Sequence, residues 1–101
     1  MPTGFQKKVW QKIKNIPKGK VSTYKLLAFA IKKKKAYQAV GQALKKNPFW
    51  PKVPCHRIVK SNGELGGFSR GKRVKKRLLE KEEIGFKKNK IIDFKKYLYR
   101  F

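Results

Sequence analysis

Cys55 and His56 are neighbours in the sequence, and they are the one place where a nucleophile and a base lie together. A thiol becomes a strong nucleophile when a base, a positive field or a helix N-terminus favours its thiolate. Adjacent side chains on an extended backbone point in opposite directions, so His56 would reach the thiol through a water molecule or across a sharp turn. The alternative is that Cys55 is a small buried hydrophobic residue without chemistry.

The chain contains one Cys and one His among its 101 residues. An internal disulfide is therefore excluded, and a closed zinc site cannot be built from soft ligands alone. We therefore expect no metal site built from Cys and His. The role of Cys55 is then either solitary packing or reactivity.

The residues before this pair predict three helices. The first places its apolar residues on one helical face before a turn at Pro17: Phe5, Val9, Ile13 and Ile16. Ser22 or Thr23 can cap the second, whose apolar residues are Leu26, Leu27, Ala30 and Ile31. The third is predicted from about Ala36 to Lys46, with inward-facing Ala36, Ala39, Val40, Ala43 and Leu44. The second and third helices have the outline of a helix-turn-helix, and an ordinary helical hairpin is the alternative.

The segment from Phe49 to Ser69 is rich in Pro and Gly, which predicts a loop with at most short extended pieces. A loop of this length in so small a domain is usually functional. A fourth helix is predicted to run to about Glu83, marked by Val74, Leu78 and Leu79. A short hairpin of residues 84–86 with 91–94 and a last apolar turn at Tyr97 and Leu98 complete one domain, mainly α with short β pieces.

The charge of the chain is strongly positive, with 29 Lys and Arg against 5 Asp and Glu, a net +24. Like charges at this density oppose compaction unless a polyanion neutralises them, which favours nucleic acid as the partner. Solvated faces that serve solubility are the alternative for any single basic run, such as residues 32–35. No apolar run reaches membrane-spanning length and no signal-peptide stretch is present, so we expect no membrane partner and a cytoplasmic, nucleoid-associated location.

Several blocks of this sequence resemble the O6-alkylguanine-DNA alkyltransferases. The active-site block is Val53-Pro54-Cys55-His56-Arg57-Ile58-Val59, followed by Gly63, Gly66-Gly67-Phe68-Ser69 and the helix from Leu78-Leu79 to Glu82. Upstream, the blocks that resemble the family's DNA-binding helices and asparagine hinge are Gly19-Lys20-Val21-Ser22-Thr23-Tyr24, Ala39-Val40-Gly41 and Lys46-Asn47-Pro48. The resemblance implies the C-terminal catalytic and DNA-binding domain of that family, a winged-helix-like helix-turn-helix fold with an active-site loop.

The resemblance also implies a reaction, in which a damaged guanine is flipped out of double-stranded DNA and its alkyl group moves irreversibly to Cys55. His56 would take the thiol proton through a bound water, and Glu82 would orient His56. Tyr24 would donate a hydrogen bond from its hydroxyl to the guanine, and Asn47 would hold the loop. No cofactor and no metal would be needed for this transfer. The pocket would be lined by Val53, Pro54, Ile58, Phe68 and Ser69. A monomer would bind the minor groove without sequence preference through Thr23, Gln38, Ala39, Gly41, Lys45 and Arg57.

Three features depart from the family's pattern. The resemblance begins near Phe5, so we expect residues 1–101 to form a single domain without the family's N-terminal domain. Gln38 stands where the family has an arginine, and Phe68 where it often has a tyrosine. The main rival is an alkyltransferase-like protein that binds alkylated guanine without repairing it, but such proteins replace the acceptor that is present here as Cys55. A generic basic helix-turn-helix protein is the more distant alternative.

Overall fold

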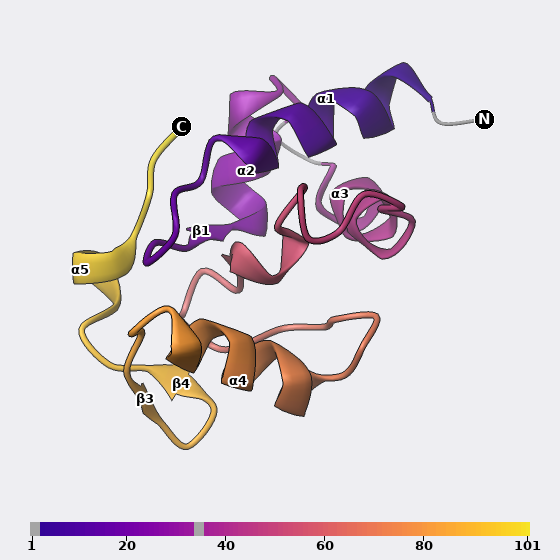
Figure 1. Cartoon of the computed structure of the whole chain (residues 1–101). Coiled ribbons are helices and arrows are strands. Elements are labelled where there is room, and N and C mark those ends of the chain that lie inside the picture. Colours follow the sequence, from indigo (N-terminus) through magenta and orange to yellow (C-terminus); the bar gives the residue numbers. More distant parts are fainter. Residues whose placement is uncertain (1–2, 34–35) are drawn as a thin grey trace.

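The N-terminal half is a bundle of three helices in a computed structural model that describes residues 3–33 and 36–101 (Figure 1). The helices are α1 (Gly4–Lys14), α2 (Tyr24–Ala30) and α3 (Tyr37–Lys45), and each packs against the other two. Thr3 caps α1 in a capping box with Gln6, and Thr23 caps α2 by accepting from the Leu26 N–H. All three predicted helices are therefore confirmed.

The core of this bundle contains the residues whose spacing predicts the helices. Buried at its centre are Val9, Ile13, Ile16, Leu27, Val40 and Ala43. The prediction for Ala39 is wrong, because it is exposed on α3 and not turned inward. Helices α2 and α3 are consecutive and packed together, as predicted for a helix-turn-helix. Lys34 and Lys35 of the predicted basic run lie outside the described residues.

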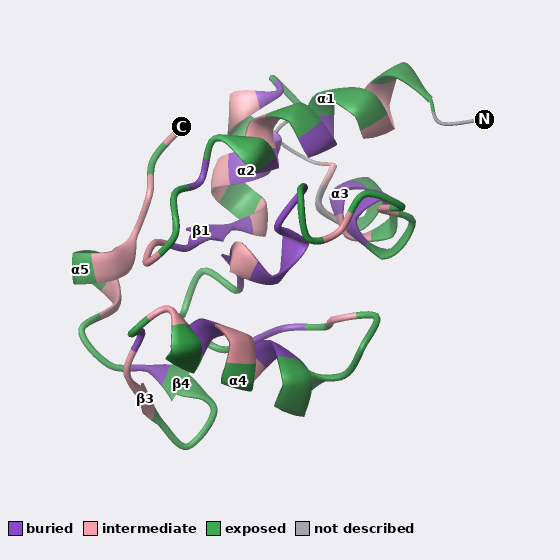
Figure 2. Cartoon of the chain, in the orientation of Figure 1, coloured by how far each residue is buried: buried purple, intermediate pink, exposed green. Residues whose placement is uncertain are grey.

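A short parallel strand pair joins this bundle to the Cys-His segment. Strand β1 (Ser22–Thr23) pairs with β2 (Ile58–Val59), with Ser22 opposite Ile58 and Thr23 opposite Val59. The 3-10 turn η1 (Cys55–Arg57) directly precedes β2, and Tyr24 directly follows β1. The backbone at Cys55 and His56 is thus a sharp turn and not extended, and Figure 2 shows this central region as largely buried.

The C-terminal half adds α4 (Lys72–Lys81), the antiparallel hairpin β3 (Phe86–Lys87) with β4 (Lys90–Ile91), and α5 (Phe94–Tyr97). A second core lies beneath them, formed by Val21, Val59, Leu65, Leu79, Ile84 and Ile91. The predicted fourth helix and hairpin are confirmed, although α4 ends before Glu82. Val74 on this helix is 42% exposed, whereas Lys75 is 1% exposed.

The last residues return to the start of the fold. The Val21 N–H donates to the Tyr97 carbonyl at 2.8 Å, and the Tyr99 N–H donates to the Val21 carbonyl at 2.7 Å. The Ser22 hydroxyl donates to the Tyr99 carbonyl at 2.8 Å. These bonds fix the segment that leads into Tyr24. The fold class is confirmed as mainly helical with short strands.

Candidate active site

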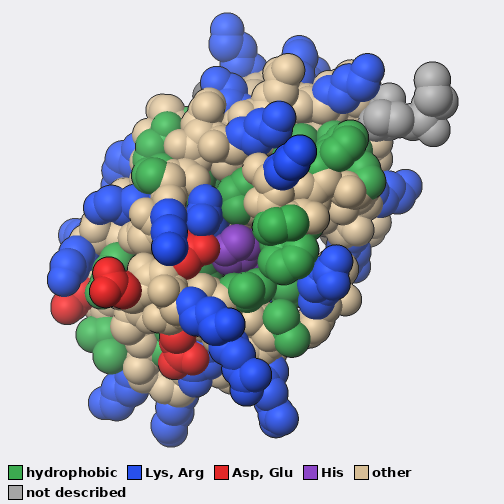
Figure 3. All heavy atoms as spheres, in the orientation of Figure 1, with side chains coloured by type: hydrophobic (Ala, Val, Ile, Leu, Met, Phe, Trp, Pro, Cys, Tyr) green, Lys and Arg blue, Asp and Glu red, His purple; other side chains and the backbone are tan. Residues whose placement is uncertain are grey.

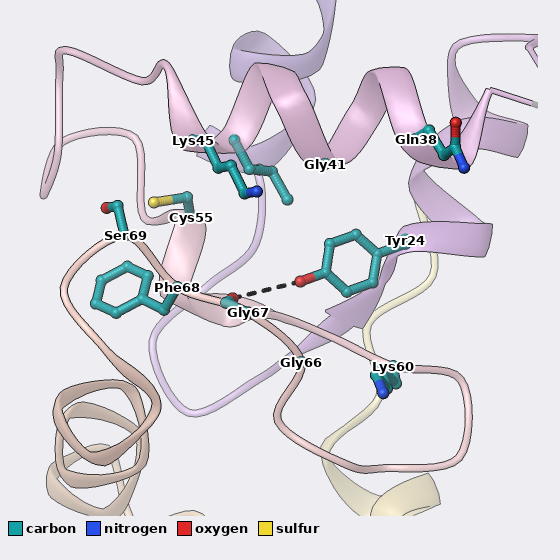
Figure 4. A pocket seen from close by; sticks show the side chains of 11 residues that line it. Tyr24, Gln38, Gly41, Lys45, Cys55, Lys60, Gly66, Gly67, Phe68 and Ser69 are labelled. Atoms are coloured by element: carbon teal, nitrogen blue, oxygen red, sulfur yellow. Dashed lines mark hydrogen bonds between the residues drawn. The ribbon is translucent and has the colours of Figure 1, made fainter.

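Cys55 lines a cavity of about 390 Å³ between α2, α3 and the loop of residues 66–69 (Figure 4). Tyr24 lies on the other side of this cavity in the close view, the Gly67 carbonyl lies below between it and Cys55, and α3 forms the upper wall. The lining residues are Tyr24, Gln38, Gly41, Leu44, Lys45, Cys55, Lys60, Gly66, Gly67, Phe68 and Ser69. A cavity of this size with an apolar wall and a few polar groups suits a small planar ligand.

Cys55 is 6% exposed, so its thiol meets the cavity and little else of the solvent. Burial raises the pKa of the Cys55 thiol above its ordinary value. A hydrogen bond from Asn47 and the positive charges of Lys75 and Arg70 oppose this rise, because each favours the thiolate. The site therefore contains the electropositive surroundings that a reactive cysteine needs.

His56 and Glu82 form the hydrogen bond that the sequence resemblance implies. The His56 Nε2 atom lies 2.9 Å from the Glu82 Oε2 atom. Burial lowers the pKa of His56 below its ordinary value, and the carboxylate of Glu82 opposes this shift. Burial favours a higher pKa for Glu82, but hydrogen bonds from Arg57 and His56 outweigh it and hold the pKa below its usual range.

Arg57 holds the same Glu82 carboxylate that His56 contacts. Its Nε and second terminal nitrogen donate to the two Glu82 carboxylate oxygens at 2.9 and 3.0 Å, a bidentate pair. Its other terminal nitrogen donates to the Ile16 carbonyl at 3.0 Å. Arg57 therefore positions Glu82. The sequence analysis predicted a DNA contact for Arg57 and did not predict this role.

Tyr24 lies across the cavity from Cys55, and the 66–69 loop runs between the two residues (Figure 4). The Tyr24 hydroxyl donates weakly to the Gly67 carbonyl at 3.5 Å. Burial raises the pKa of Tyr24, and a thiolate charge at Cys55 adds to the rise. The hydroxyl therefore keeps its proton at neutral pH and can donate it to a bound molecule.

Asn47 fixes the loop between α3 and the Cys-His turn. Its side-chain nitrogen donates to the Val53 carbonyl at 2.8 Å, and its side-chain oxygen accepts from the Phe49 N–H at 2.9 Å. These two bonds close a short loop whose end carries Cys55. The position of Asn47 is consistent with the loop-holding role that the resemblance implies.

Two residues of the site escaped the sequence analysis. The Trp50 indole nitrogen donates to His56 Nδ1 at 3.1 Å, and no pattern in the sequence links these residues. The buried Lys75 ammonium donates to the Gly67 carbonyl at 3.1 Å and lies 5.9 Å from the centre of the Tyr24 ring. Burial lowers the pKa of Lys75 to about 7, while a thiolate at Cys55 opposes that shift. Lys75 stands four residues before Leu79, so helical spacing was the signal for its inward position.

Other predicted site residues lie at different depths. Phe68, Ser69, Gln38, Gly41 and Lys45 line the cavity. Three predicted pocket residues are buried behind the wall and do not line it: Val53, Pro54 and Ile58. Thr23 is 3% exposed with its hydroxyl engaged in capping α2, so the structure gives it a structural role. Ala39 is exposed on α3 beside the rim. Within residues 3–33 and 36–101, no cluster of three or more His, Cys, Asp or Glu that could hold a metal is present.

Comparison with known proteins places this site in a family. Residues 4–84 match the family model described as "6-O-methylguanine DNA methyltransferase, DNA binding domain". The chain belongs to this family. Methylated-DNA–protein-cysteine methyltransferases from Methanosarcina barkeri and Sulfolobus acidocaldarius are 46% and 48% identical to it over 81 and 80 residues. These matches cover 80% and 79% of this chain and 51% and 50% of the relatives. The chain thus spans about half the length of the curated relatives it matches.

Two solved structures of the family's neighbourhood differ in how much of them is matched. The crystal structure of Mycobacterium tuberculosis OGT in complex with DNA is 38% identical, with a TM-score of 0.79 over 82% of this chain and 52% of that chain. The structure of S. pombe Atl1 in complex with damaged DNA containing O6-carboxymethylguanine is 29% identical, with a TM-score of 0.84 over 100% of both chains. The resemblance to the alkyltransferase family is therefore confirmed by both sequence and fold.

Proposed function

We propose that this protein repairs O6-alkylguanine in DNA by transferring the alkyl group to Cys55 in a single turnover. The observation that carries the proposal is the position of the thiol, which lines a cavity faced by Tyr24. His56 belongs to the same turn as Cys55 and is hydrogen-bonded to Glu82. The cavity accepts a flat base, and a thiolate is a soft nucleophile suited to a saturated carbon.

The reaction begins when the proton of the Cys55 thiol moves to His56, which Glu82 stabilises as the imidazolium. The thiolate attacks the alkyl carbon, a C–S bond forms, and the bond between that carbon and guanine O6 breaks. The electron pair of that bond stays with guanine, which takes up one proton as it leaves. The return of His56 to its neutral form releases one proton, so the proton lost by the thiol balances the proton gained by guanine. Tyr24 donates a hydrogen bond to the departing base, so that no full negative charge develops on it. The resulting thioether ends the turnover.

The charge distribution supports DNA as the partner and α3 as the contact element. No Asp or Glu occurs before Glu64, so α1, α2, α3 and the Cys-His turn carry basic residues without acidic ones. Figure 3 shows Lys and Arg side chains spread over the visible face with few acidic ones among them. Helix α3 presents the exposed Gln38 and Lys45 at the cavity, and Ala39 is exposed on the same helix. We infer that a monomer places this helix in the minor groove of duplex DNA, with Gln38 beside the gap left by the flipped base.

Lesion binding without transfer is the second candidate. It is favoured by the structural match to S. pombe Atl1 in complex with damaged DNA, whose TM-score of 0.84 exceeds the 0.79 of the M. tuberculosis OGT complex. Cys55 favours transfer, because it supplies the acceptor atom in the cavity.

The two candidates separate in one experiment. The protein is incubated with a duplex containing O6-methylguanine, and its intact mass is measured before peptide mapping. We expect one hydrogen to be replaced by one methyl group, located on Cys55, and no change in Cys55→Ser. Tight binding to the lesion duplex without a mass change would contradict repair and support lesion sensing. Equal affinity for the lesion and the undamaged duplex, again without a mass change, would contradict both.

A further inference from the structure

Both ring nitrogens of His56 are engaged in hydrogen bonds. The Nε2 atom lies 2.9 Å from Glu82 Oε2, and the Nδ1 atom lies 3.1 Å from the indole nitrogen of Trp50. An indole N–H can only donate, so Nδ1 must accept and carries no proton. The neutral ring then has its proton on Nε2, from which it donates to the carboxylate. The hydrogen-bond partners thereby assign the tautomer.

This arrangement leaves His56 no free lone pair for a proton from Cys55. The bond to Glu82 is anchored, because Arg57 holds the same carboxylate with two hydrogen bonds. The bond from Trp50 is therefore the one that must break before Nδ1 can take a proton. We propose that Trp50 is a positioning residue that holds His56 as the neutral Nε2–H tautomer and withholds its base nitrogen until the indole moves. The proposal rests on the alkyl-transfer function proposed above.

The surroundings of Trp50 connect this motion to occupancy of the cavity. Its ring packs edge-on against Phe68, which lines the cavity, with the ring centres 6.2 Å apart. The guanidinium of Arg70 lies 4.6 Å from the Trp50 ring centre. A base that enters the cavity presses on Phe68, and a DNA phosphate draws Arg70 away from the indole. Trp50 is half-buried in an otherwise exposed stretch of loop, residues 48–52.

Charged groups facing His56 set the pH range in which the contact matters. Glu82 favours the imidazolium, and it opposes the effect of burial, Arg57 and Lys75. Arg70 adds a positive charge across the indole. Protonation at Nδ1 would also place two N–H donors face to face at the Trp50 contact, which is repulsive. At neutral pH the resting state is therefore the neutral ring bonded to Trp50.

The chain is well suited to a direct test, because it has one His and one Cys, so each signal belongs to one residue. Nitrogen-15 NMR of the full chain without DNA reports the His56 tautomer and any coupling through the bond between Trp50 Nε1 and His56 Nδ1. We expect the Nε2–H tautomer and a measurable coupling. In Trp50→Phe the coupling disappears, and alkylation of Cys55 by iodoacetamide at neutral pH becomes about fivefold faster, the factor that one neutral hydrogen bond is worth.

The matched control is Trp10→Phe, which removes the other indole. Trp10 donates to the Ala43 carbonyl at 2.9 Å in the helical core, and its ring packs edge-on against Phe49. Both ring nitrogens of His56 are bonded to other residues. We expect the tautomer and the thiol reactivity to remain as in the unmodified chain. Because this variant leaves Trp50 as the single tryptophan, its fluorescence reports the indole directly, and we expect it to change when a lesion duplex is added.

Several results would overturn the assignment. An Nδ1–H tautomer in the unmodified chain, an unchanged thiol reactivity in folded Trp50→Phe, or an unchanged Trp50 fluorescence on the lesion duplex would each do so. If Trp50→Phe does not fold, the proposal is tested by the His56 tautomer in the unmodified chain and by the Trp50 fluorescence in Trp10→Phe. The NMR and iodoacetamide measurements need no DNA, so they can succeed where methyl transfer fails. A missing methyl adduct would then refute the repair function and not the Trp50–His56 contact.

Discussion

Glu82 is the residue on which the polar contacts of the site converge. Its two carboxylate oxygens accept hydrogen bonds from His56 and from Arg57, and the Gly19 N–H lies 3.5 Å from one of them. Because α4 ends just before Glu82, the carboxylate reaches back across the fold to the Cys-His turn. This one acidic side chain therefore orients the His56 imidazole. It also links the Cys-His turn, the turn at Gly19 and the end of α4.

Replacing Glu82 tests this convergence. In Glu82→Gln, Arg57 loses its charged partner and His56 loses the group that stabilises its protonated form. We expect the free energy of unfolding to fall by roughly 1–3 kcal/mol and methyl transfer to slow. Urea unfolding and single-turnover rates measure the two effects. Glu80→Gln, an exposed carboxylate on the same helix, is the control and should change neither. A transfer rate equal to the unmodified rate would remove Glu82 from the chemistry.

Lys75 predicts a dependence of stability on pH. Burial lowers the pKa of Lys75 to about 7 in the folded chain, against an ordinary value near 10.4 for an unfolded lysine. Between these values the unfolded state binds more protons, so this lysine makes stability rise with pH from about 7 to about 10. Below about pH 7 both states are protonated, and the cost of burying the charge is fully present.

Lys75→Met should flatten this rise and increase the stability near pH 7. The same change removes a positive charge that favours the Cys55 thiolate, so the thiol should titrate at higher pH. Urea unfolding at several pH values and iodoacetamide kinetics measure the two effects, with the exposed Lys87→Met as control. A pH profile of stability that matches the unmodified chain would show that Lys75 is not the titrating group.

Among the elements, the parallel pair β1–β2 decides how the two halves of the site face each other. Tyr24 follows one strand and Cys55 belongs to the turn that precedes the other, so the register of two residue pairs sets their relative position. The loop of residues 66–69 then closes the cavity from a third direction. The backbone of this loop passes so close to Tyr24 that only glycine fits at position 66.

Gly66 is the point of closest approach. It has a φ of +72°, and a Cβ atom added there would lie 2.9 Å from the Tyr24 hydroxyl oxygen. We expect Gly66→Ala to lower the free energy of unfolding by at least about 1–2 kcal/mol, because the backbone region itself is unfavourable for alanine. It should also displace Tyr24 and slow methyl transfer. Thermal unfolding and single-turnover rates measure both effects.

Gly67→Ala is the stability control for that substitution. A Cβ atom at Gly67 meets no heavy atom within 4 Å, and its φ is not in the left-handed range. The free energy of unfolding should therefore change little. Equal destabilisation by both substitutions would contradict the close approach at Gly66.

The elements were largely predictable from the sequence, whereas the contacts inside the site were not. Helical spacing and capping residues are local signals, and they identify α1, α2, α3 and α4. The turn at Cys55 has local hydrogen bonds to the Val53 and Pro54 carbonyls, but it leads into β2, whose long-range pairing with β1 leaves no local trace in the sequence. The resemblance supplied the pairing of His56 with Glu82. The contact between Trp50 and His56 was not predicted. A tryptophan in a Pro-rich loop has no periodic spacing that would indicate its partner.

For the whole molecule, the governing property is the net charge of +24 on 101 residues. All five acidic residues lie at or after Glu64, so the helical half that contains α3 has no internal compensation. Every helix in the described ranges is also too short or too polar to span a bilayer. The excess positive charge is best neutralised by the phosphates of the proposed DNA partner.

Salt therefore governs the affinity for DNA. If the protein neutralises about five phosphates, its affinity should fall by roughly two to three orders of magnitude between 50 and 200 mM salt. Fluorescence anisotropy with an undamaged duplex measures this slope. A double substitution of exposed α3-side lysines, Lys45→Gln with Lys46→Gln, should make the slope shallower by about one to two phosphates. A salt-independent affinity would contradict binding through the phosphate backbone.

The hydrogen bonds between Val21 and the chain's last residues have a practical consequence for anyone who shortens or labels this protein. The family match ends at residue 84, yet the backbone partners of Val21 and Ser22 come from Tyr97 and Tyr99. Cutting at the edge of the match would strip those partners from the strand that delivers the tyrosine to the cavity. Fluorophores, affinity tags and fusion partners therefore belong beyond Phe101, with the closing segment left intact.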